Sequence, residues 1–345
     1  MQNQACWQNA ACEPVELGPA GLYEPGPGQI LVKNKCIAFS PIDFKDQRFQ
    51  VHPKRYPAIL GTSFAGDVLA VGPDVIEFQP GDRVAVNRAD RTLSDPAHGV
   101  YQRYALASVE TTTRIPERTS LESAAAIMIN LTTMVAALSH HMGLARPPTD
   151  GDGIAPRNGL RILIYGGSSS CGGLGTRYAS DAGYSVVTTS SPQNRAFVET
   201  LGATHIIDHS QPEGDIVAEF KGHGPYHAVI DCVSLPPSFK ILCRLLGETG
   251  GVLYGLHPTK GPRFQFEFPP QVEYRYFPMA WALEEEANRD LREWYYQRYL
   301  PWGLSSGRIV PTRHRVVEGG LENVQKTLDI LATGGVNGHK LVMHP

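Results

Sequence analysis

The residues best able to do chemistry form a turn of small side chains between two apolar runs. The turn Gly166–Gly173 reads GGSSSCGG and follows the apolar run Ile162–Tyr165. Apolar residues then recur at helical spacing up to Gly183, and a second apolar run, Ser185–Thr189, comes next. A strand, a small-residue turn, a helix and a strand form the unit that seats a dinucleotide, because small residues let the backbone approach the pyrophosphate. We therefore predict a dinucleotide site bordered by Ser168, Ser169, Ser170 and Cys171.

The glycine pattern of this turn is incomplete. Counted from Gly167, the spacing G-x-G-x-x-G is not met, because Ser169 occupies the second glycine position. A glycine-rich turn alone could serve any tight strand-to-helix connection. The strand that follows the helix supports the dinucleotide interpretation.

The end of the second strand indicates which dinucleotide would bind. It reads Thr188-Thr189-Ser190-Ser191 and carries no carboxylate, the group that usually holds the ribose 2′-hydroxyl of NAD. The hydrogen-bond donors Ser191, Asn194 and Arg195 stand there instead, and they suit the 2′-phosphate of NADPH. Alternatively, Pro192–Arg195 is only the polar start of the next helix, with Ser191 as its N-cap.

Composition limits the class of protein. The chain has 345 residues, of which 42% are hydrophobic and 19% charged, so about two globular domains are expected. Its net charge of −3 gives no electrostatic reason to expect a nucleic-acid partner. We see no signal peptide and no apolar run long enough to span a bilayer, so we predict a cytoplasmic protein without a membrane partner. The six cysteines include no C-x-x-C pair, which argues against a zinc cluster or a redox dithiol.

The two halves of the chain differ in pattern. Up to Ala107, short alternating runs such as Gln29–Ala38 are separated by Gly/Pro turns, which predicts a partly closed β-barrel. Beyond the small-residue turn, further apolar runs alternate with helical patterns, which predicts a parallel sheet. These runs are Thr204–Asp208, Tyr226–Val233 and Gly250–Leu256.

Four motifs in order carry a family resemblance. They read SPIDFK, LGTSFAGDV, PGDRV and GVYQRYA, and the Gly/Ser turn follows them. This arrangement resembles the medium-chain dehydrogenase/reductase superfamily. The resemblance implies a GroES-like catalytic domain, residues 1–127 with 295–345, and a Rossmann NADP-binding domain, residues 128–294. The nicotinamide is then expected in the cleft between them.

The resemblance also bears on metal. Zinc-dependent alcohol dehydrogenases of this superfamily carry Cys where Ser40 stands and a G-H-E motif where Gly61-Thr62-Ser63 stands. Hydroxyls are poor zinc ligands beside thiolate and imidazole, and the four-cysteine structural zinc lobe is missing as well. We therefore predict no metal site and a zinc-free branch of the superfamily.

Further site residues are implied by the same resemblance. Contacts to the cofactor are expected from Ile42, Asp43, Phe44, Lys45, His209, Gly255, Leu256, Val336 and Asn337. Of these, His209 is expected near the adenosine, Gly255-Leu256 near the nicotinamide ribose and Val336-Asn337 near the nicotinamide. Lys45 is a predicted catalytic-site residue that binds phosphate or ribose rather than transferring protons.

A helix is predicted from a capping box at Thr119 and Glu122 to about Met142, with a break near Asn130. In the superfamily a similar segment faces the nicotinamide and the substrate. We expect substrate contacts from Met128, Asn130, Thr133 and Met134, with the Thr133 hydroxyl on the substrate carbonyl. Alternatively, Thr132 and Thr133 are ordinary helix residues whose hydroxyls bond back one turn.

Two later segments have less specific patterns. The aromatic stretch Phe264–Met279 could line the mouth of the site, form a dimer edge or serve packing. The stretch Leu283–Trp302 is expected to be an amphipathic helix.

The C-terminal tail narrows the resemblance. The stretch Gly319–Val342 resembles fungal trans-acting enoyl reductases that serve polyketide synthases lacking a working reductase domain, and GGSSSCG resembles their GGSSSVG. This chain has Gly335, Asn337 and His339 where Lys, Ser and Glu are common there. The resemblance implies NADPH-dependent reduction of the C=C bond of an α,β-unsaturated polyketide thioester. The substrate would arrive on a synthase carrier domain, in secondary-metabolite biosynthesis.

Two other functions remain open. One is a zinc-free NADPH quinone or enone reductase that acts on free small molecules, and the other is a non-catalytic NADPH-binding protein of the same fold. The sequence identifies no proton donor, so solvent is allowed in that role, and the chain could be a monomer or a homodimer.

Overall fold

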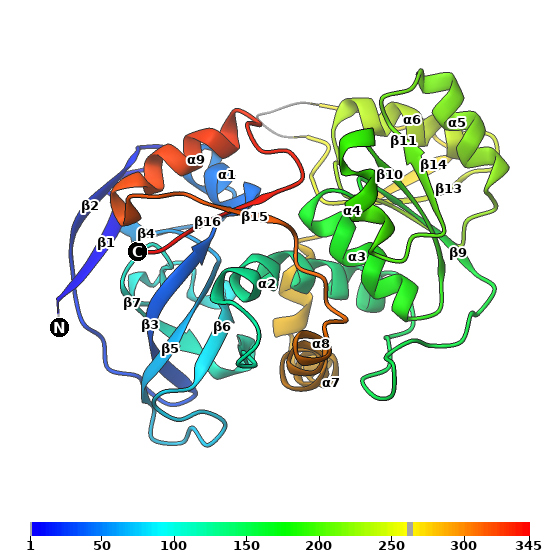
Figure 1. The fold of residues 1–345 in the computed structure, drawn as a ribbon. Coiled ribbons are helices and arrows are strands. Elements are labelled where there is room, and N and C mark those ends of the chain that lie inside the picture. The colour runs from blue at the N-terminus through cyan, green and yellow to red at the C-terminus, as the bar shows by residue number, and fades with distance from the viewer. Residues whose placement is uncertain (1, 261–264) are drawn as a thin grey trace. The chain divides into compact units, whose positions relative to one another are not determined.

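The computed structural model describes residues 2–260 and 265–345. The chain divides into two compact units (Figure 1). The first unit comprises Met1–Thr132 and Leu283–Pro345, and the second comprises Thr133–Ala282.

The first unit is built on β structure. A seven-stranded sheet has the order β15-β16-β3-β5-β6-β8, with β7 paired to β3, and a three-stranded sheet has the order β2-β1-β4. The strands are β1 (Asn3–Gln8), β2 (Val15–Ala20), β3 (Gln29–Ala38), β4 (Ala58–Ile59), β5 (Ser63–Val71), β6 (Arg83–Asn87), β7 (Tyr104–Ser108), β8 (Thr112–Arg114), β15 (His314–Val316) and β16 (Lys340–Met343). The predicted strand Gln29–Ala38 is confirmed as the strand that pairs with β5, β7 and β16.

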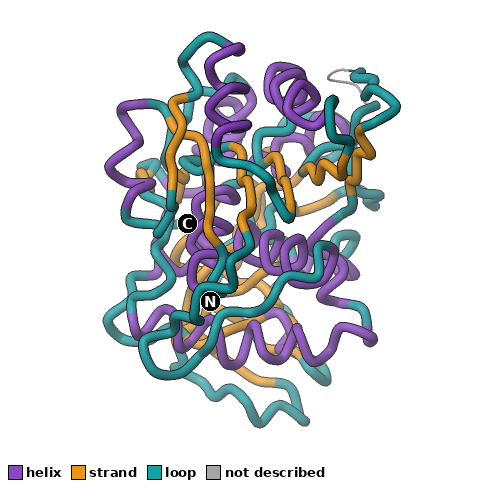
Figure 2. The backbone as a smooth tube through the Cα atoms, turned by 90° about the vertical axis from the view of Figure 1, so that its right-hand side faces the viewer, coloured by secondary structure: helices purple, strands orange, loops and turns teal. Residues whose placement is uncertain are grey.

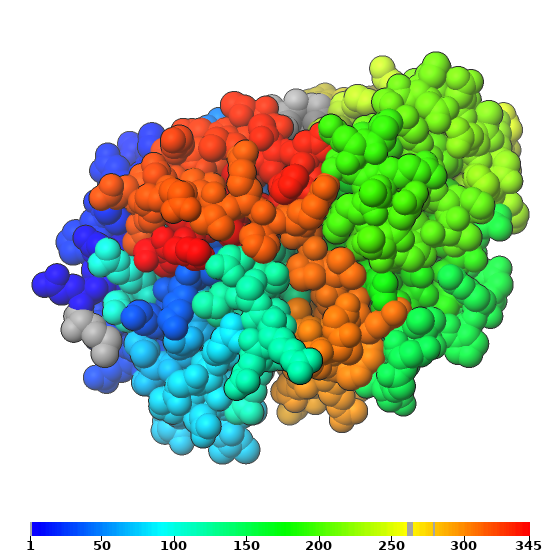
Figure 3. All heavy atoms as spheres, in the orientation of Figure 1, coloured from blue at the N-terminus to red at the C-terminus, as the bar shows by residue number. Residues whose placement is uncertain are grey.

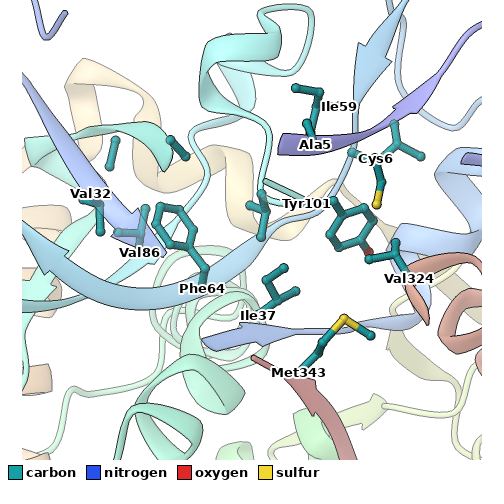
Figure 4. Close-up of a cluster of buried hydrophobic side chains, with 14 of the residues drawn as sticks. Ala5, Cys6, Val32, Ile37, Ile59, Phe64, Val86, Tyr101, Val324 and Met343 are labelled. Carbon is teal, nitrogen blue, oxygen red and sulfur yellow. The ribbon is translucent and has the colours of Figure 1, made fainter. Parts of the chain in front are cut away.

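The core of the first unit joins the two ends of the chain. Figure 4 shows side chains from the N-terminal strands converging with Val324 of α9 (Val324–Ala332) and Met343 of β16. Helix α9 packs against α1 (Pro41–Phe49). In the space-filling view of Figure 3, the blue N-terminal and the orange to red C-terminal residues belong to this unit. The C-terminal strand is thus part of the same hydrophobic core as the first strand.

The helix predicted from Thr119 to about Met142 is present, but its start and its continuity differ from the prediction. Helix α2 (Leu121–Val135) continues without a break at Asn130 and passes into a π-helix, Ala136–His141. Its N-cap is Ser120, whose hydroxyl accepts the Ser123 N–H at 3.1 Å, so the predicted cap at Thr119 is one residue too early.

This helix also corrects the expectation that no apolar run could span a bilayer. Within the described residues, the segment Leu121–His141 is long and apolar enough by length and composition. In the structure, 72% of its most apolar window is buried, as in the core helix of a globular protein.

The second unit contains a six-stranded parallel sheet with the order β11-β10-β9-β12-β13-β14. Its strands are β9 (Arg161–Tyr165), β10 (Ser185–Ser190), β11 (His205–Asp208), β12 (Ala228–Asp231), β13 (Gly251–Gly255) and β14 (Val272–Tyr276). Its helices are α3 (Ser170–Asp181), α4 (Arg195–Glu199), α5 (Glu213–Gly222) and α6 (Pro236–Leu246). Figure 2 distinguishes these helices and strands by colour. The predicted parallel sheet is confirmed, and its strand order reverses between β9 and β12.

Strand β14 lies inside the aromatic stretch Phe264–Met279 and was not predicted. It pairs with β13 at one edge of the sheet. Phe266, Phe268 and Tyr274 pack around Phe239 of α6, with ring centroids 5.1 to 5.3 Å from it. The packing alternative therefore holds for these three rings, whereas Phe264 lies outside the described residues.

The predicted helix Leu283–Trp302 starts later than expected. Short 3₁₀ turns cover Met279–Glu284 and Glu286–Asn288, and a helix then runs through α7 (Arg289–Glu293), a π-helix at Trp294–Tyr299 and α8 (Leu300–Ser306). The buried Arg292 donates to the Leu283 carbonyl at 3.1 Å, which stabilises the non-helical approach.

Candidate functional site

The turn between β9 and α3 is held by backbone and hydroxyl contacts. The Ser169 hydroxyl accepts the Gly172 N–H at 3.0 Å and caps α3. A Cβ on Gly172 would lie 2.1 Å from the Gly166 carbonyl oxygen, so helix and strand approach as closely as glycine allows. Ser169, which replaces the second glycine of the motif, thus acts as the cap of the helix.

The predicted phosphate contacts lie together at this turn. Ser168 and Ser169 precede α3, while Ser170 and Cys171 open it, and all four are partly exposed. The positive end of the helix dipole and the hydroxyl groups form a donor set that fits a phosphate. The chemistry of the turn therefore suits a dinucleotide.

The end of β10 carries the residues predicted for the 2′-phosphate. Asn194 is buried and its Nδ2 donates to Ser191 Oγ at 3.2 Å. Arg195 is exposed, and its guanidinium contacts Glu199 Oε1 at 3.1 Å and the Ile206 carbonyl at 3.0 Å. Pro192–Asn194 is a 3₁₀ turn leading into α4, so the alternative of a polar helix start describes the local structure. Ser191 and Asn194 are brought together, while Arg195 is held towards β11.

The remaining predicted cofactor contacts of the second unit lie at the same edge of the sheet. Gly255 ends β13, and the Leu256 N–H donates to Ser234 Oγ at 2.7 Å. His209 directly follows β11 and is exposed. Because parallel strands end at one edge, these residues lie at the edge that holds the turn after β9 and Ser191.

Asp231 is a buried carboxylate at this edge to which the sequence analysis assigned no role. It ends β12 and accepts hydrogen bonds from the N–H groups of Val233 and Ser234 at 2.9 Å and from Ser238 Oγ at 2.5 Å. Burial raises the pKa of Asp231 to about 6, against the opposite effect of these hydrogen bonds. Since Ser234 Oγ accepts the Leu256 N–H, the loop that Asp231 stabilises after β12 in turn holds a predicted cofactor contact after β13.

In the first unit, the predicted segment Ile42–Lys45 forms the first turns of α1. The Ser40 N–H donates to Asp43 Oδ2 at 2.6 Å, and Thr62 Oγ1 donates to Asp43 Oδ1 at 3.1 Å. Asp43 and Phe44 are buried, while Ile42 and Lys45 are partly exposed. Burial raises the pKa of Asp43 to about 6, although these bonds and the charge of Lys340 act in the opposite direction. The carboxylate of Asp43 is therefore part of the cap that starts α1.

The predicted substrate residues lie on α2. Met128, Asn130 and Met134 are buried, and Thr133 is partly exposed. The Thr132 hydroxyl donates to the Met128 carbonyl at 2.8 Å, so the alternative of a back-bonded helix residue holds for Thr132. Asn130 and Thr133 are three residues apart in one helix and share a face of it.

Lys340 is a residue that the sequence analysis missed. It is 3% exposed, and its ammonium donates to Ser40 Oγ at 2.5 Å and to Asn130 Oδ1. The signal was available, since a lysine that opens the apolar strand KLVM contradicts the usual exposure of lysine. Val336 and Asn337 precede it in the loop after α9; Val336 is partly exposed and Asn337 is exposed.

The same cluster shows what stands at the positions of the zinc ligands of related alcohol dehydrogenases. The Ser40 hydroxyl contacts an ammonium, and the Thr62 hydroxyl contacts Asp43. In residues 2–260 and 265–345, no group of three or more His, Cys, Asp or Glu side chains could hold a metal ion. These donors do not fit a zinc ion.

Comparison with known proteins defines the class. Residues 26–117 match the alcohol dehydrogenase GroES-like domain, and residues 171–273 match the zinc-binding dehydrogenase family. The chain is 30% identical over 349 residues to the trans-enoyl reductase himH of Aspergillus japonicus, covering 99% of this chain and 97% of that protein. It therefore belongs to the medium-chain dehydrogenase/reductase superfamily of oxidoreductases, with the GroES-like and Rossmann-type fold that the sequence predicted.

Two further comparisons complete this result. The chain is 30% identical over 341 residues to the zinc-binding alcohol dehydrogenase domain-containing protein cipB of Emericella nidulans, covering 97% of this chain and 96% of that protein. Its fold matches the Escherichia coli quinone oxidoreductase complexed with NADPH at a TM-score of 0.76 and 18% identity, covering all of both chains.

Proposed function

We propose that this protein is a zinc-independent, NADPH-dependent enoyl reductase that acts in trans with a polyketide synthase. It would reduce the C=C bond of an α,β-unsaturated polyketide thioester in secondary-metabolite biosynthesis. The observation that carries the proposal is the likeness to a trans-enoyl reductase along 99% of the chain.

The cofactor proposal is supported by the edge of the parallel sheet. Ser168–Cys171 would hold the pyrophosphate, and Ser191, Asn194 and Arg195 the 2′-phosphate. His209, Gly255, Leu256, Val336, Asn337 and the segment Ile42–Lys45 would complete the site. The absence of an acid at the end of β10 and the NADPH complex of the Escherichia coli relative in fold both support this choice. When bound, NADPH supplies the hydride for the β-carbon of the substrate.

The protein's own side chains would bind and polarise the substrate. Thr133 would donate a hydrogen bond to the thioester oxygen, on which negative charge develops during reduction. Lys45 would bind phosphate or ribose, while Met128, Asn130 and Met134 would border the acyl chain. Solvent would supply the proton to the α-carbon.

The biological setting is proposed from the same likeness. The substrate would be delivered on a carrier domain of the synthase, in the cytoplasm, to a monomer or homodimer. The two units would correspond to the catalytic domain predicted at residues 1–127 with 295–345 and the cofactor domain predicted at residues 128–294.

The experiment that tests the proposal is NADPH oxidation with an α,β-unsaturated acyl thioester, compared with NADH and with a free quinone. We expect turnover with NADPH and the thioester and little with the other two combinations. Preference for NADH would contradict the roles given to Ser191, Asn194 and Arg195. Binding of NADPH without turnover of either acceptor would indicate a non-catalytic protein of this fold.

A second candidate is a zinc-free quinone or enone reductase that acts on free small molecules. The chain is as similar to cipB as to the trans-enoyl reductase himH, and the name of cipB specifies no thioester chemistry. This similarity is the reason to consider a function on free small molecules. Turnover of the quinone with none of the thioester would establish this second function.

A further inference from the structure

Three segments of the first unit, distant in sequence, meet at the ammonium of Lys340. Its Nζ donates to Ser40 Oγ at 2.5 Å and to Asn130 Oδ1. Ser40 directly precedes α1, Asn130 lies within α2, and Lys340 opens β16. A backbone hydrogen bond joins the neighbours of Ser40 and Lys340, since the Phe39 N–H donates to the Leu341 carbonyl at 2.9 Å. Lys340 thus joins the starts of α1 and β16 to the middle of α2.

The burial of this lysine needs an explanation beyond packing. Lys340, Ser40 and Asn130 are each at least nine-tenths buried. Removing an ammonium from water is unfavourable unless it is paired and hydrogen-bonded. A methionine would fill a similar volume at this strand position without that cost, and the rest of β16 is apolar and buried.

Charge in the cluster is balanced by Asp43. Asp43 is buried and holds the Ser40 N–H and the Thr62 hydroxyl. The positive charge of Lys340 lowers the pKa of Asp43, although burial raises it more. Ser40 therefore contacts the ammonium through its hydroxyl and the carboxylate through its N–H.

The donor chemistry of lysine also orients Asn130. An ammonium has donors and no acceptor, so the side chain of Asn130 must turn its oxygen towards Lys340. The amide NH₂ is then turned away from the ammonium. Asn130 shares a face of α2 with Thr133, so the contact sets which group α2 presents beside Thr133.

We infer that Lys340 is a positioning residue of the active site, which fixes Ser40 and Asn130 where turnover requires them. This rests on the proposed function, in which Ile42–Lys45 contact the cofactor and α2 contacts the substrate. The lysine acts through these groups and need not touch the substrate itself.

The first test is the Lys340→Met variant of the full-length protein. We expect kcat with the acyl thioester to fall about tenfold or more, and the Kd for NADPH to rise about threefold. The reason is that the start of α1 and the middle of α2 are no longer held in position. Lys35→Met is the matched control, since Lys35 of β3 forms a partly exposed ion pair with Asp67 of β5. We expect the control to keep the Tm, the kcat and the Kd of the wild type.

A second variant separates positioning from simple charge balance. Lys340→Met removes a cation close to the buried Asp43, so a lower Tm is expected. Adding Asp43→Asn removes the charge that Lys340 balanced and should recover most of the Tm. Asp43 itself lies in the segment proposed to contact the cofactor, so the Asp43→Asn single variant is the reference for activity. If Lys340 positions the site, kcat and the NADPH Kd of the double variant stay impaired relative to that single variant.

Two results would contradict the inferred positioning role of Lys340. Recovery of kcat and Kd together with the Tm in the double variant would overturn it, as would a Lys340→Met enzyme with wild-type kcat and Kd. If the wild type turns over neither thioester nor quinone, the proposed function fails. The NADPH Kd, measured by nicotinamide fluorescence, and the Tm of the same variants still decide the role of Lys340.

Discussion

The turn after β9 and the cluster around Lys340 bring groups together in opposite ways. The turn uses consecutive residues, with Ser169 capping the helix that Gly172 brings close to Gly166. The cluster joins residues 210 and 300 positions apart, through buried charges. The first arrangement is neutral and local, and the second is charged and assembled by the tertiary fold.

This difference has a consequence for mutation. In a local turn, one added methyl group disturbs the backbone that would contact the ligand. In a charged cluster, the loss of one partner leaves another buried charge uncompensated. The two regions should therefore fail through sterics and through electrostatics respectively.

The largest effect is expected for Gly172→Ala. Its Cβ would lie 2.1 Å from a backbone oxygen that cannot rotate away, so the turn must open. We expect the affinity for NADPH to fall about 100-fold, equivalent to about 2.7 kcal/mol, the scale of one or two hydrogen bonds to a charged group. Fluorescence titration with NADPH measures this change.

Gly214→Ala is the matched control in the same unit. Gly214 lies in α5, and a Cβ there would meet no atom within 4 Å. We expect unchanged NADPH affinity and a slightly raised Tm, because alanine favours a helix by about 0.5–1 kcal/mol over glycine. Equal NADPH affinity of the two alanine variants would contradict the steric argument.

Sequence patterns predicted the fold well where structure is local. The runs at Ile162–Tyr165 and Ser185–Thr189 are strands of a parallel sheet, because buried strands read as short apolar stretches between breakers. Strand β14 was not predicted although Tyr274 and Tyr276 alternate with charged Glu273 and Arg275, because prolines flank this short run on both sides. The π-helix at Ala136–His141 was missed as well, since its residues read as ordinary helix.

The second expected effect is on turnover and compares two neighbours on α2. Thr133→Val would remove the hydroxyl proposed to polarise the substrate carbonyl, and we expect kcat to fall about tenfold, the equivalent of one good hydrogen bond. Thr132→Val removes a buried hydroxyl bonded to Met128, so the Tm should fall while kcat stays within about twofold. Steady-state kinetics and thermal unfolding of both variants measure this. Equal kcat values for the two would remove Thr133 from the mechanism.

The site could be predicted only in part. The positions of Ser168–Cys171, Ser191 and Asn194 could be predicted because each follows a strand of the parallel sheet, and parallel strands end at one edge. Lys340 could not be predicted in this way, because its partners depend on how β16 and α2 pack. The contact of Arg195 with the Ile206 carbonyl likewise depends on how α4 packs on β11, whereas its contact with Glu199 lies within α4.

A smaller effect is expected when a charge is added at the end of β10. Ser191→Asp places a residue that is also favoured at an N-cap before the 3₁₀ turn, and sets a carboxylate where we propose the 2′-phosphate. We expect the preference for NADPH over NADH to fall about fivefold, because solvent screens a partly exposed charge. The ratio of kcat/KM for the two cofactors measures it, and Ser191→Ala is the control for loss of the hydroxyl alone. An unchanged ratio would mean that the 2′-phosphate binds elsewhere.

The smallest effect compares the two buried carboxylates, Asp231 and Asp43. Burial raises the pKa of each to about 6. Between the ordinary carboxyl pKa and that value, the folded protein keeps a proton that the unfolded chain has lost. The free energy of unfolding therefore falls as the pH rises from about 4 to about 6, and the penalty is complete above pH 6.

Asparagine at these two positions should change stability with opposite sign at pH 7. Asp231→Asn removes the charge and keeps an oxygen for the N–H groups of Val233 and Ser234, so we expect a gain of about 1 kcal/mol and a flatter pH profile. Asp43→Asn leaves Lys340 without its nearby carboxylate, so we expect a loss. Thermal unfolding at pH 4, 5, 6 and 7 distinguishes the two. If both variants gain stability at pH 7, Lys340 does not depend on Asp43 for charge balance, and the cluster around Lys340 does not fail through electrostatics.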